Sequence, residues 1–277
     1  MGRVSDSFPA HRPSVATALP LSSSDDRARD IVRHELVRRS LTVTAVHDLT
    51  TTIRRVVLTG DDLGGFVSLG PADHVKAFFP TSEGTPARRD YTPAVYREDG
   101  DGRPELAIDF VIHDLSGPAS AWAAEVRAGS TLEIGGPRGS RLAPRGYRRF
   151  VLIADESALP ALARWAATVS PIAEVLAFVQ SADPAVLDYP IPTGDRVAVT
   201  RIGTGAEAAL TAIGGLHLDA DTFVWAAGEA GALIPLRRHL RRDLGLAKEQ
   251  VVVDGYWKSG VVALDHHAPL DPDDLDD

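Results

Sequence analysis

Residues 149–169 read RFVLIADESALPALARWAATV and place a strand, a turn and a helix in close succession. The run RFVLIAD is apolar at successive positions, which predicts a strand buried on both faces of a sheet. The run that follows repeats its apolar side chains from Leu159 to Val169 at the spacing of one helical face. A buried strand that leads directly into such a helix is typical of an α/β domain with a parallel sheet.

The same alternation continues toward the C-terminus. A second helix is predicted over 232–245, with Gly245 as its stop signal. Its apolar stripe consists of Leu233, Leu236, Leu240 and Leu244. The further strands expected here are EVLAFVQ (174–180), DRVAVTRI (195–202), TFVWAAG (222–228) and VVVDGYW (251–257). These elements predict βαβ units and a mostly parallel sheet.

The N-terminal half has a different texture, rich in β-branched residues and turn signals. A short charged helix is expected at 30–39 and a helical insert at 118–126. The expected strands are LTVTAVHDL (41–49), TTIRRVVLTG (51–60), DHVKAFFP (73–80), RRDYTPAVYR (88–97), ELAIDFVIH (105–113) and STLEIGGP (130–137). Short strands at this spacing predict an antiparallel barrel or sandwich.

We therefore predict four segments along the chain. They are a disordered or partly helical extension (1–38), an antiparallel β-barrel domain (39–147), a smaller α/β domain (148–264) and a mobile acidic tail (265–277).

Composition limits the possible functions. The 277 residues are 44% hydrophobic and carry a net charge of −9, which opposes nucleic acid and anionic membranes as partners. The chain has no cysteine, which excludes thiolate zinc sites and Cys-ligated iron–sulfur clusters carried by it. We expect no metal site at the tail's His266–His267 pair. No apolar run reaches the roughly 18 residues of a membrane span and no signal-peptide core is present, so we expect a soluble, cytoplasmic protein.

The segment Arg89-Asp90-Tyr91-Thr92 has the residue types that a flavin requires. An aromatic ring can lie against the isoalloxazine, a hydroxyl or amide near its edge and a cation near its phosphates. Arg89 and Tyr91 share one face of a strand, and Thr92 lies on the other. The same four residues also fit a surface strand with no ligand.

Two further segments have the form of ligand sites. Gly117 before Pro118 opens a helix whose first amides, with Ser120, suit a pyrophosphate, although an ordinary helix start looks the same. In the second half, 154–160 and 227–231 follow strands at the end of the sheet where ligands bind. The glycines of 227–231 also fit a tight strand-to-helix turn.

Taken together and in this order, these segments resemble the siderophore-interacting protein family, FAD-dependent ferric-siderophore reductases related to ferredoxin reductases. The resemblance runs from about Leu41 to Gly260 and rests on LTVTAV, DHVKAFFP, RDYTPAVYR, DFVIHDLSGPASAWA, LEIGGPRGS, ADESALPAL, WAAGEAGA and GYWKSG. It implies an FAD-binding barrel followed by an α/β domain that receives the electron donor.

The resemblance also implies roles for particular residues, none of them a catalytic acid, base or nucleophile. The cofactor-binding residues it implies are Arg89, Asp90, Tyr91, Thr92, His113, Gly117, Pro118, Ala119, Ser120, Trp122, Asp155, Ser157, Ala158, Gly228 and Glu229. One position departs from the family, because Ala94 stands where a second arginine is common; Arg97 is the nearest substitute. We expect weaker FAD binding as a result.

The predicted function is reduction of Fe(III) in a siderophore to Fe(II), with NADPH, NADH or a ferredoxin as electron donor. Because ferric siderophores are usually anionic, we expect a basic pocket, with Lys76 and Lys258 as substrate-binding residues. The alternatives are a flavin oxidoreductase with another acceptor and a module that binds a ferric chelate without turnover. A cluster of arginines at 237–242 fits either a docking site for an acidic donor protein or a solvated helix face. We expect a monomer.

Overall fold

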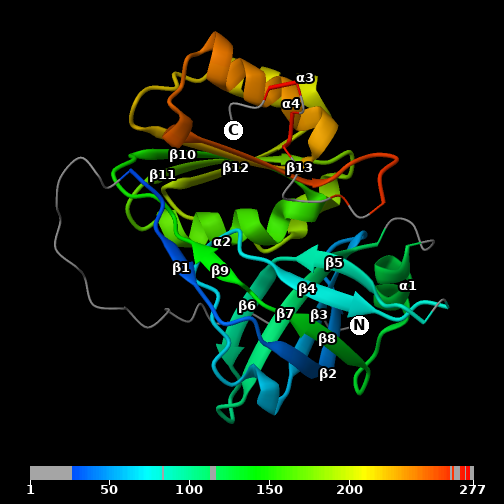
Figure 1. Cartoon of the computed structure of the whole chain (residues 1–277). Coiled ribbons are helices and arrows are strands. Elements are labelled where there is room, and N and C mark those ends of the chain that lie inside the picture. Colours follow the sequence, from blue (N-terminus) through cyan, green and yellow to red (C-terminus); the bar gives the residue numbers. More distant parts are fainter. Residues whose placement is uncertain are drawn as a thin grey trace, which may run out of the picture.

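The computed structural model describes residues 27–82, 84–112, 117–262, 264, 269–271 and 273–274. Two sheets dominate these residues, one antiparallel and one parallel, and they are stacked one above the other in Figure 1. The predicted fold class, a β-barrel followed by an α/β domain, is confirmed.

The antiparallel sheet curls into a half-barrel with the order β5-β4-β8-β2-β3-β7-β6. Its inner side chains alternate along each strand and form one apolar core that includes Leu41, Val56 and Phe79. Helix α1 (Pro118–Glu125) packs against β4, β5 and β7. The strands are β2 (Arg38–Asp48), β3 (Ile53–Thr59), β4 (Val75–Phe79), β5 (Ala87–Tyr91), β6 (Pro93–Glu98), β7 (Pro104–Val111) and β8 (Thr131–Gly135). Strands β5 and β6 follow one another in the chain but lie at opposite edges, so the barrel is open between them.

The parallel sheet has the order β12-β11-β10-β13-β14, and every neighbouring pair in it is parallel. Its strands are β10 (Arg149–Asp155), β11 (Glu174–Gln180), β12 (Val197–Ile202), β13 (Thr222–Glu229) and β14 (Val251–Trp257). Helix α2 (Leu159–Val169) lies between this sheet and the barrel, whereas α3 (Ala206–Gly214) and α4 (Ala230–Arg238) cover the far face (Figure 1). The chain winds outward from β10 and then returns to β13, so a topological switch point lies between these two strands.

The helix predicted at 30–39 is wrong. Residues Ile31–Arg33 form strand β1, which pairs with β9 (Gly139–Arg141), and β2 already begins at Arg38. The pairing is close at Gly139, where a Cβ atom would lie 2.8 Å from the Val32 carbonyl oxygen. A partner strand from far along the chain has therefore overridden the local charge pattern.

The second predicted helix ends differently from the expectation. A single π-turn over His239–Asp243 widens the helix after α4, and Leu244 is exposed rather than part of the apolar stripe. Leu246 is buried in its place, after Gly245 turns the chain at a φ of 67°. Leu233, Leu236 and Leu240 are buried as expected.

Three arginines of this helix pair with carboxylates of the tail. Arg238 donates two hydrogen bonds to Asp271, at 2.6 and 2.8 Å, and Arg237 and Arg242 pair with Asp274. Asp271 is buried, so residues 271 and 274 of the tail contact α4, and the mobility expected of the tail as a whole stays a prediction. His266 and His267 lie outside the described residues.

No helix among the described residues is long and apolar enough to cross a membrane. Within the same residues, no cluster of three or more His, Asp or Glu side chains is arranged to hold a metal ion.

Candidate functional site

The switch point of the parallel sheet is organised around the carboxylate of Asp155, the last residue of β10. It accepts hydrogen bonds from the Ser157 amide and hydroxyl, at 2.9 and 2.5 Å, and from the Glu229 amide at 2.9 Å. The indole Nε1 of Trp257 donates a further bond at 2.8 Å. Burial raises the pKa of Asp155, and these donors oppose that rise by stabilising the charged form.

Gly228 is required for this arrangement. Its φ is 148°, and a Cβ atom would lie 2.5 Å from an Asp155 carboxylate oxygen. Any larger residue would therefore displace the carboxylate from the turn.

The neighbouring residues close the same turn. Glu229 caps α4 through the Ala232 amide and also accepts the Ser259 amide, at 2.6 and 3.0 Å. Ser157 and the buried Ala158 form a 3-10 turn that leads into α2. The structure thus brings together the residues predicted in 155–158 and 228–229 at the switch point.

Two aromatic residues at the end of β14 complete this edge and were missed in the sequence. Trp257 is 45% exposed even though its indole is bonded to Asp155. Tyr256 packs against the apolar core that contains α2, and burial raises its pKa above the usual value. The signal available in the sequence was an aromatic pair at the carboxyl end of a parallel strand.

On the barrel, Tyr91 ends the edge strand β5 and packs on a buried aromatic cluster. Its ring centroid lies 4.5 Å from that of Phe110 and 6.1 Å from that of Phe79. Trp122 of α1 packs on the same two rings, at 5.5 and 5.6 Å. Burial raises the pKa of Tyr91, which keeps its hydroxyl neutral. Thr92 is buried directly after it.

No side chain among the described residues caps the start of α1. Gly117 is its N-cap, and a Cβ atom on Gly117 would meet nothing within 4 Å. Ala119 is buried, and the Ser120 hydroxyl is 3.5 Å from the Val111 carbonyl oxygen. At the other end, the carbonyls of 123 and 124 accept hydrogen bonds from Arg54. Within the described part of the chain, the N-terminal end of this helix is therefore the end that suits an anion.

Arg89 shares the Tyr91 face of β5. Its guanidinium donates to the Arg88 carbonyl at 2.7 Å, and no carboxylate among the described residues pairs with it. Arg97, the substitute considered for the arginine replaced at Ala94, is bonded to Glu105 at 3.2 Å. His113 lies outside the described residues.

Asp90 points to the opposite, outer face of β5. It stands directly across from Lys76 on β4, and the two form an ion pair of 2.7 Å. Lys258 follows β14 in a short bridge with Val261. The structure therefore places the two predicted substrate lysines on different domains, with the charge of Lys76 partly compensated.

The chain matches two family models. Residues 147–260 match the siderophore-interacting protein model, and residues 42–87 and 81–141 match the siderophore-interacting FAD-binding domain. A relative described as an NADPH-dependent ferric-chelate reductase, from Escherichia coli, is 36% identical over 248 residues, which cover 82% of this chain and 95% of the relative. The chain belongs to the siderophore-interacting protein family.

Other members of the family are similar along most of their length. The ferric vibriobactin reductase ViuB of Vibrio cholerae is 27% identical and matches over 84% of this chain and 90% of its own. The structure of a siderophore utilization protein from T. fusca has a TM-score of 0.77 at 36% identity, covering 87% of this chain and all of that one. SipS from Aeromonas hydrophila has a TM-score of 0.67 at 25% identity, covering 83% and 94%.

The residues present fit FAD. The amides at the start of α1 and the guanidinium of Arg89, which pairs with no carboxylate among the described residues, provide two sources of positive charge for a pyrophosphate. Tyr91 supplies an aromatic face at the barrel's open edge, next to Thr92.

Proposed function

We propose that this protein is an FAD-dependent reductase of ferric siderophores that takes its electrons from NADPH. The observation that carries the proposal is the hydrogen bond of 2.9 Å that Arg164 of α2 donates to the carbonyl of Pro93, the residue after Thr92. It joins the predicted flavin strand of the barrel to the helix that follows the switch point of the parallel sheet, where dinucleotides bind in doubly wound folds. The E. coli relative, described as an NADPH-dependent ferric-chelate reductase, supports the same donor and acceptor.

FAD held at this site would supply the conversion between a two-electron donor and one-electron acceptors, so that one NADPH reduces two Fe(III) to Fe(II) with release of one proton. The protein's own residues would bind and orient the cofactor and the electron donor. Arg89 and the start of α1 would hold the pyrophosphate, Tyr91 the isoalloxazine, and Asp155 would fix the turn that the nicotinamide approaches. Iron enters and leaves as part of the substrate.

We also propose roles for individual residues. Lys76 and Lys258 would attract the anionic chelate, and Ser157, Ala158, Gly228 and Glu229 would border the donor site. NADH or a ferredoxin as donor, a monomeric state and a cytoplasmic location stay predictions from the sequence.

The test begins with the cofactor. We expect acid extraction of the purified protein, after incubation with excess flavin, to release FAD rather than FMN, because the pyrophosphate site would be empty with FMN. Anaerobic addition of NADPH should then bleach the flavin absorbance. A protein that takes up only FMN, or that ignores FAD, would overturn the proposal. A reduced flavin that no ferric chelate reoxidises would favour the alternative of a different acceptor.

A further inference from the structure

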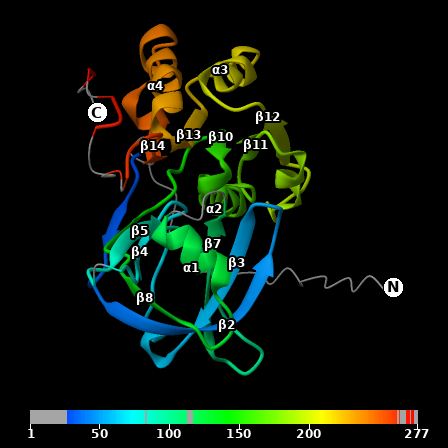
Figure 2. The ribbon, with the colours of Figure 1, turned by 90° about the vertical axis from the view of Figure 1, so that its right-hand side faces the viewer.

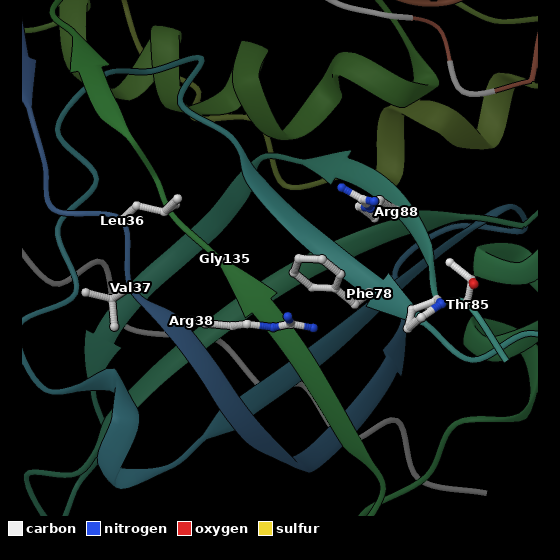
Figure 3. Close-up of a pocket in the computed structure, with 8 residues that line it drawn as sticks. Leu36, Val37, Arg38, Phe78, Thr85, Arg88 and Gly135 are labelled. Carbon is white, nitrogen blue, oxygen red and sulfur yellow. The ribbon is translucent and has the colours of Figure 1, made fainter.

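A groove of 440 Å³ lies on the outer face of the barrel, on the side of β5 opposite to Tyr91 (Figure 3). This volume is within the range of small-molecule sites. The groove is lined by Leu36, Val37, Arg38, Phe78, Thr85, Pro86, Arg88 and Gly135. None of these residues has a role in the site described above.

The floor of the groove is the ring of Phe78. In β4 this side chain points outward, directly across from Arg88 on β5. Gly135 of the neighbouring strand lies under the ring, and a Cβ atom there would lie 3.5 Å from it, an ordinary contact distance. Figure 3 shows the ring between the side chains of Arg38 and Arg88. The guanidinium carbon of Arg38 lies 4.2 Å from the ring centroid.

The two arginines differ in their partners. Arg38 is paired with Glu133 of β8, at a hydrogen-bond distance of 2.7 Å, so its charge is largely compensated. Arg88 is exposed, and among the described residues its guanidinium has no hydrogen-bond or ion-pair partner. Planar guanidinium groups bind oxyanions through paired N–H donors and also stack on aromatic rings. The groove therefore has a flat apolar floor, a stacked arginine and one uncompensated positive charge.

We propose that this groove binds an anionic aromatic ring of the ferric siderophore, of the catecholate or phenolate class. The inference rests on the proposed function and specifies its substrate class. Such a ring would stack on Phe78, and its oxygens would face Arg88. An apolar cavity of about 150 Å³ suffices for a benzene ring, so one such ring fits with space to spare. Lys76 lies two residues from Phe78 on the same face of β4 but does not itself line the groove.

Two chelates distinguish this site from general attraction of anions. The probes are a ferric tris-catecholate of the enterobactin type and a ferric trihydroxamate of the ferrioxamine type, which has no aromatic ring. Their dissociation constants are measured by equilibrium dialysis with radioactive iron, on the FAD-loaded protein. The variants are Arg88→Ala and Phe78→Leu. Arg127→Ala is the matched control, since Arg127 is an exposed barrel arginine outside the groove.

We expect each groove variant to weaken catecholate binding about five- to tenfold, from the lost charge or the lost ring contact. Trihydroxamate binding should change by less than about twofold, and Arg127→Ala should resemble the wild type. The groove is not a catecholate site if both variants bind the catecholate as the wild type does, or if they weaken both chelates equally. Arg88 is exposed on an edge strand, so Arg88→Ala should fold. This variant therefore tests the proposal even if Phe78→Leu does not fold.

The experiment gives one result if the groove does not bind the aromatic ring and another if the proposed function is wrong. A wild-type protein that reduces neither chelate with NADPH contradicts the function itself. Reduction of both chelates, with an unchanged preference between them in the two groove variants, contradicts only the groove.

Discussion

Tyr91 lies between the buried rings of the barrel and the place proposed for the flavin. Because its neighbours Phe79 and Phe110 are fully buried, loss of the Tyr91 ring should leave the core in place. We expect Tyr91→Ala to raise the Kd for FAD about tenfold, through lost stacking of ~1 kcal/mol and lost burial. Fluorescence titration of the protein with FAD measures this change.

Tyr91→Phe and Tyr96→Ala are the controls for this substitution. The first keeps the ring, and the second removes a barrel tyrosine that packs on Phe66. Both should bind FAD as the wild type does. Equal affinity in Tyr91→Ala would mean that the Tyr–Thr pair has only a structural role.

The ion pair between Lys76 and Asp90 limits the charge that Lys76 offers to a substrate. Asp90→Asn removes the compensating carboxylate, so the KM for an anionic ferric chelate should fall at low ionic strength. Lys76→Ala should raise it about fivefold, which corresponds to ~1 kcal/mol for a partly exposed charge. Lys258→Ala should act in the same direction as Lys76→Ala.

The KM values are compared at low and high salt, with FAD content checked in each variant. Added salt should reduce the differences, because it screens exposed charges. If Asp90→Asn and Lys76→Ala change KM in the same direction, the charge of Lys76 does not attract the chelate.

At the scale of the elements, the ion pair between Arg238 and Asp271 holds the C-terminal segment, and it depends on pH. The hydrogen bonds from Arg238 lower the pKa of Asp271, and desolvation opposes this shift. A carboxylate whose pKa is lower in the folded state stabilises that state above the unfolded pKa, near 3.8. The contact is therefore complete at neutral pH and is lost as the pH falls through the lower, folded value.

Hydrogen exchange of the C-terminal peptide tests this contact. We expect protection of the amide at 273, which bonds to the Asp271 carboxylate, to persist at pH 6 and to disappear below the folded pKa, after correction for intrinsic exchange rates. Asp271→Asn should remove the protection at pH 6. Asp273→Asn is the control because that side chain is 90% exposed. Protection that is independent of both pH and Asp271 would contradict the role of the ion pairs.

The sequence predicted the elements whose signals are local. The strand β10 and helix α2 follow from apolar periodicity, and the start of α1 follows from Gly117 and Pro118. Strand β1 could not be predicted in this way, because its partner β9 lies far along the chain. Helix α3 was missed, since its nine residues begin after a glycine and carry few strong signals.

The same distinction applies to the site. Asp155 and Gly228 were found because each follows a recognisable strand. Tyr256 and Trp257 were missed because their roles depend on where β14 lies relative to β10 and to the barrel. The bond from Trp257 to Asp155 exists only once β13 and β14 have been added beside β10.

At the scale of the whole molecule, buried polar contacts fix the barrel against the α/β domain. Arg164 of α2 reaches across to donate hydrogen bonds to Ser68 and to the Pro93 carbonyl, and its burial lowers its pKa. Asp109 of β7 accepts bonds from Arg55 and from Tyr189 of the other domain, at 2.6 Å for the tyrosine. Buried donors and acceptors are costly to separate, so the two halves of the site should keep one relative position.

The N-terminal segment also contacts both the barrel and the α/β domain. Arg29 donates to the carbonyls of 141 and 142 and lies over the ring of Trp165 in α2. Burial lowers its pKa to about 10, so it stays charged at neutral pH. Arg27 pairs with Asp221, next to β13. In Figure 2 this segment runs beside the sheet of the α/β domain and into the barrel.

The central claim is that electrons pass from NADPH to siderophore iron through FAD held between these domains. The most direct measurement reduces the FAD-loaded protein with one equivalent of NADPH without oxygen, and then adds a ferric siderophore together with an Fe(II)-specific chromogenic chelator. We expect the flavin absorbance to return and about two Fe(II) to be trapped per flavin, as electron balance requires. A flavin that stays reduced, with no Fe(II) formed, would contradict it.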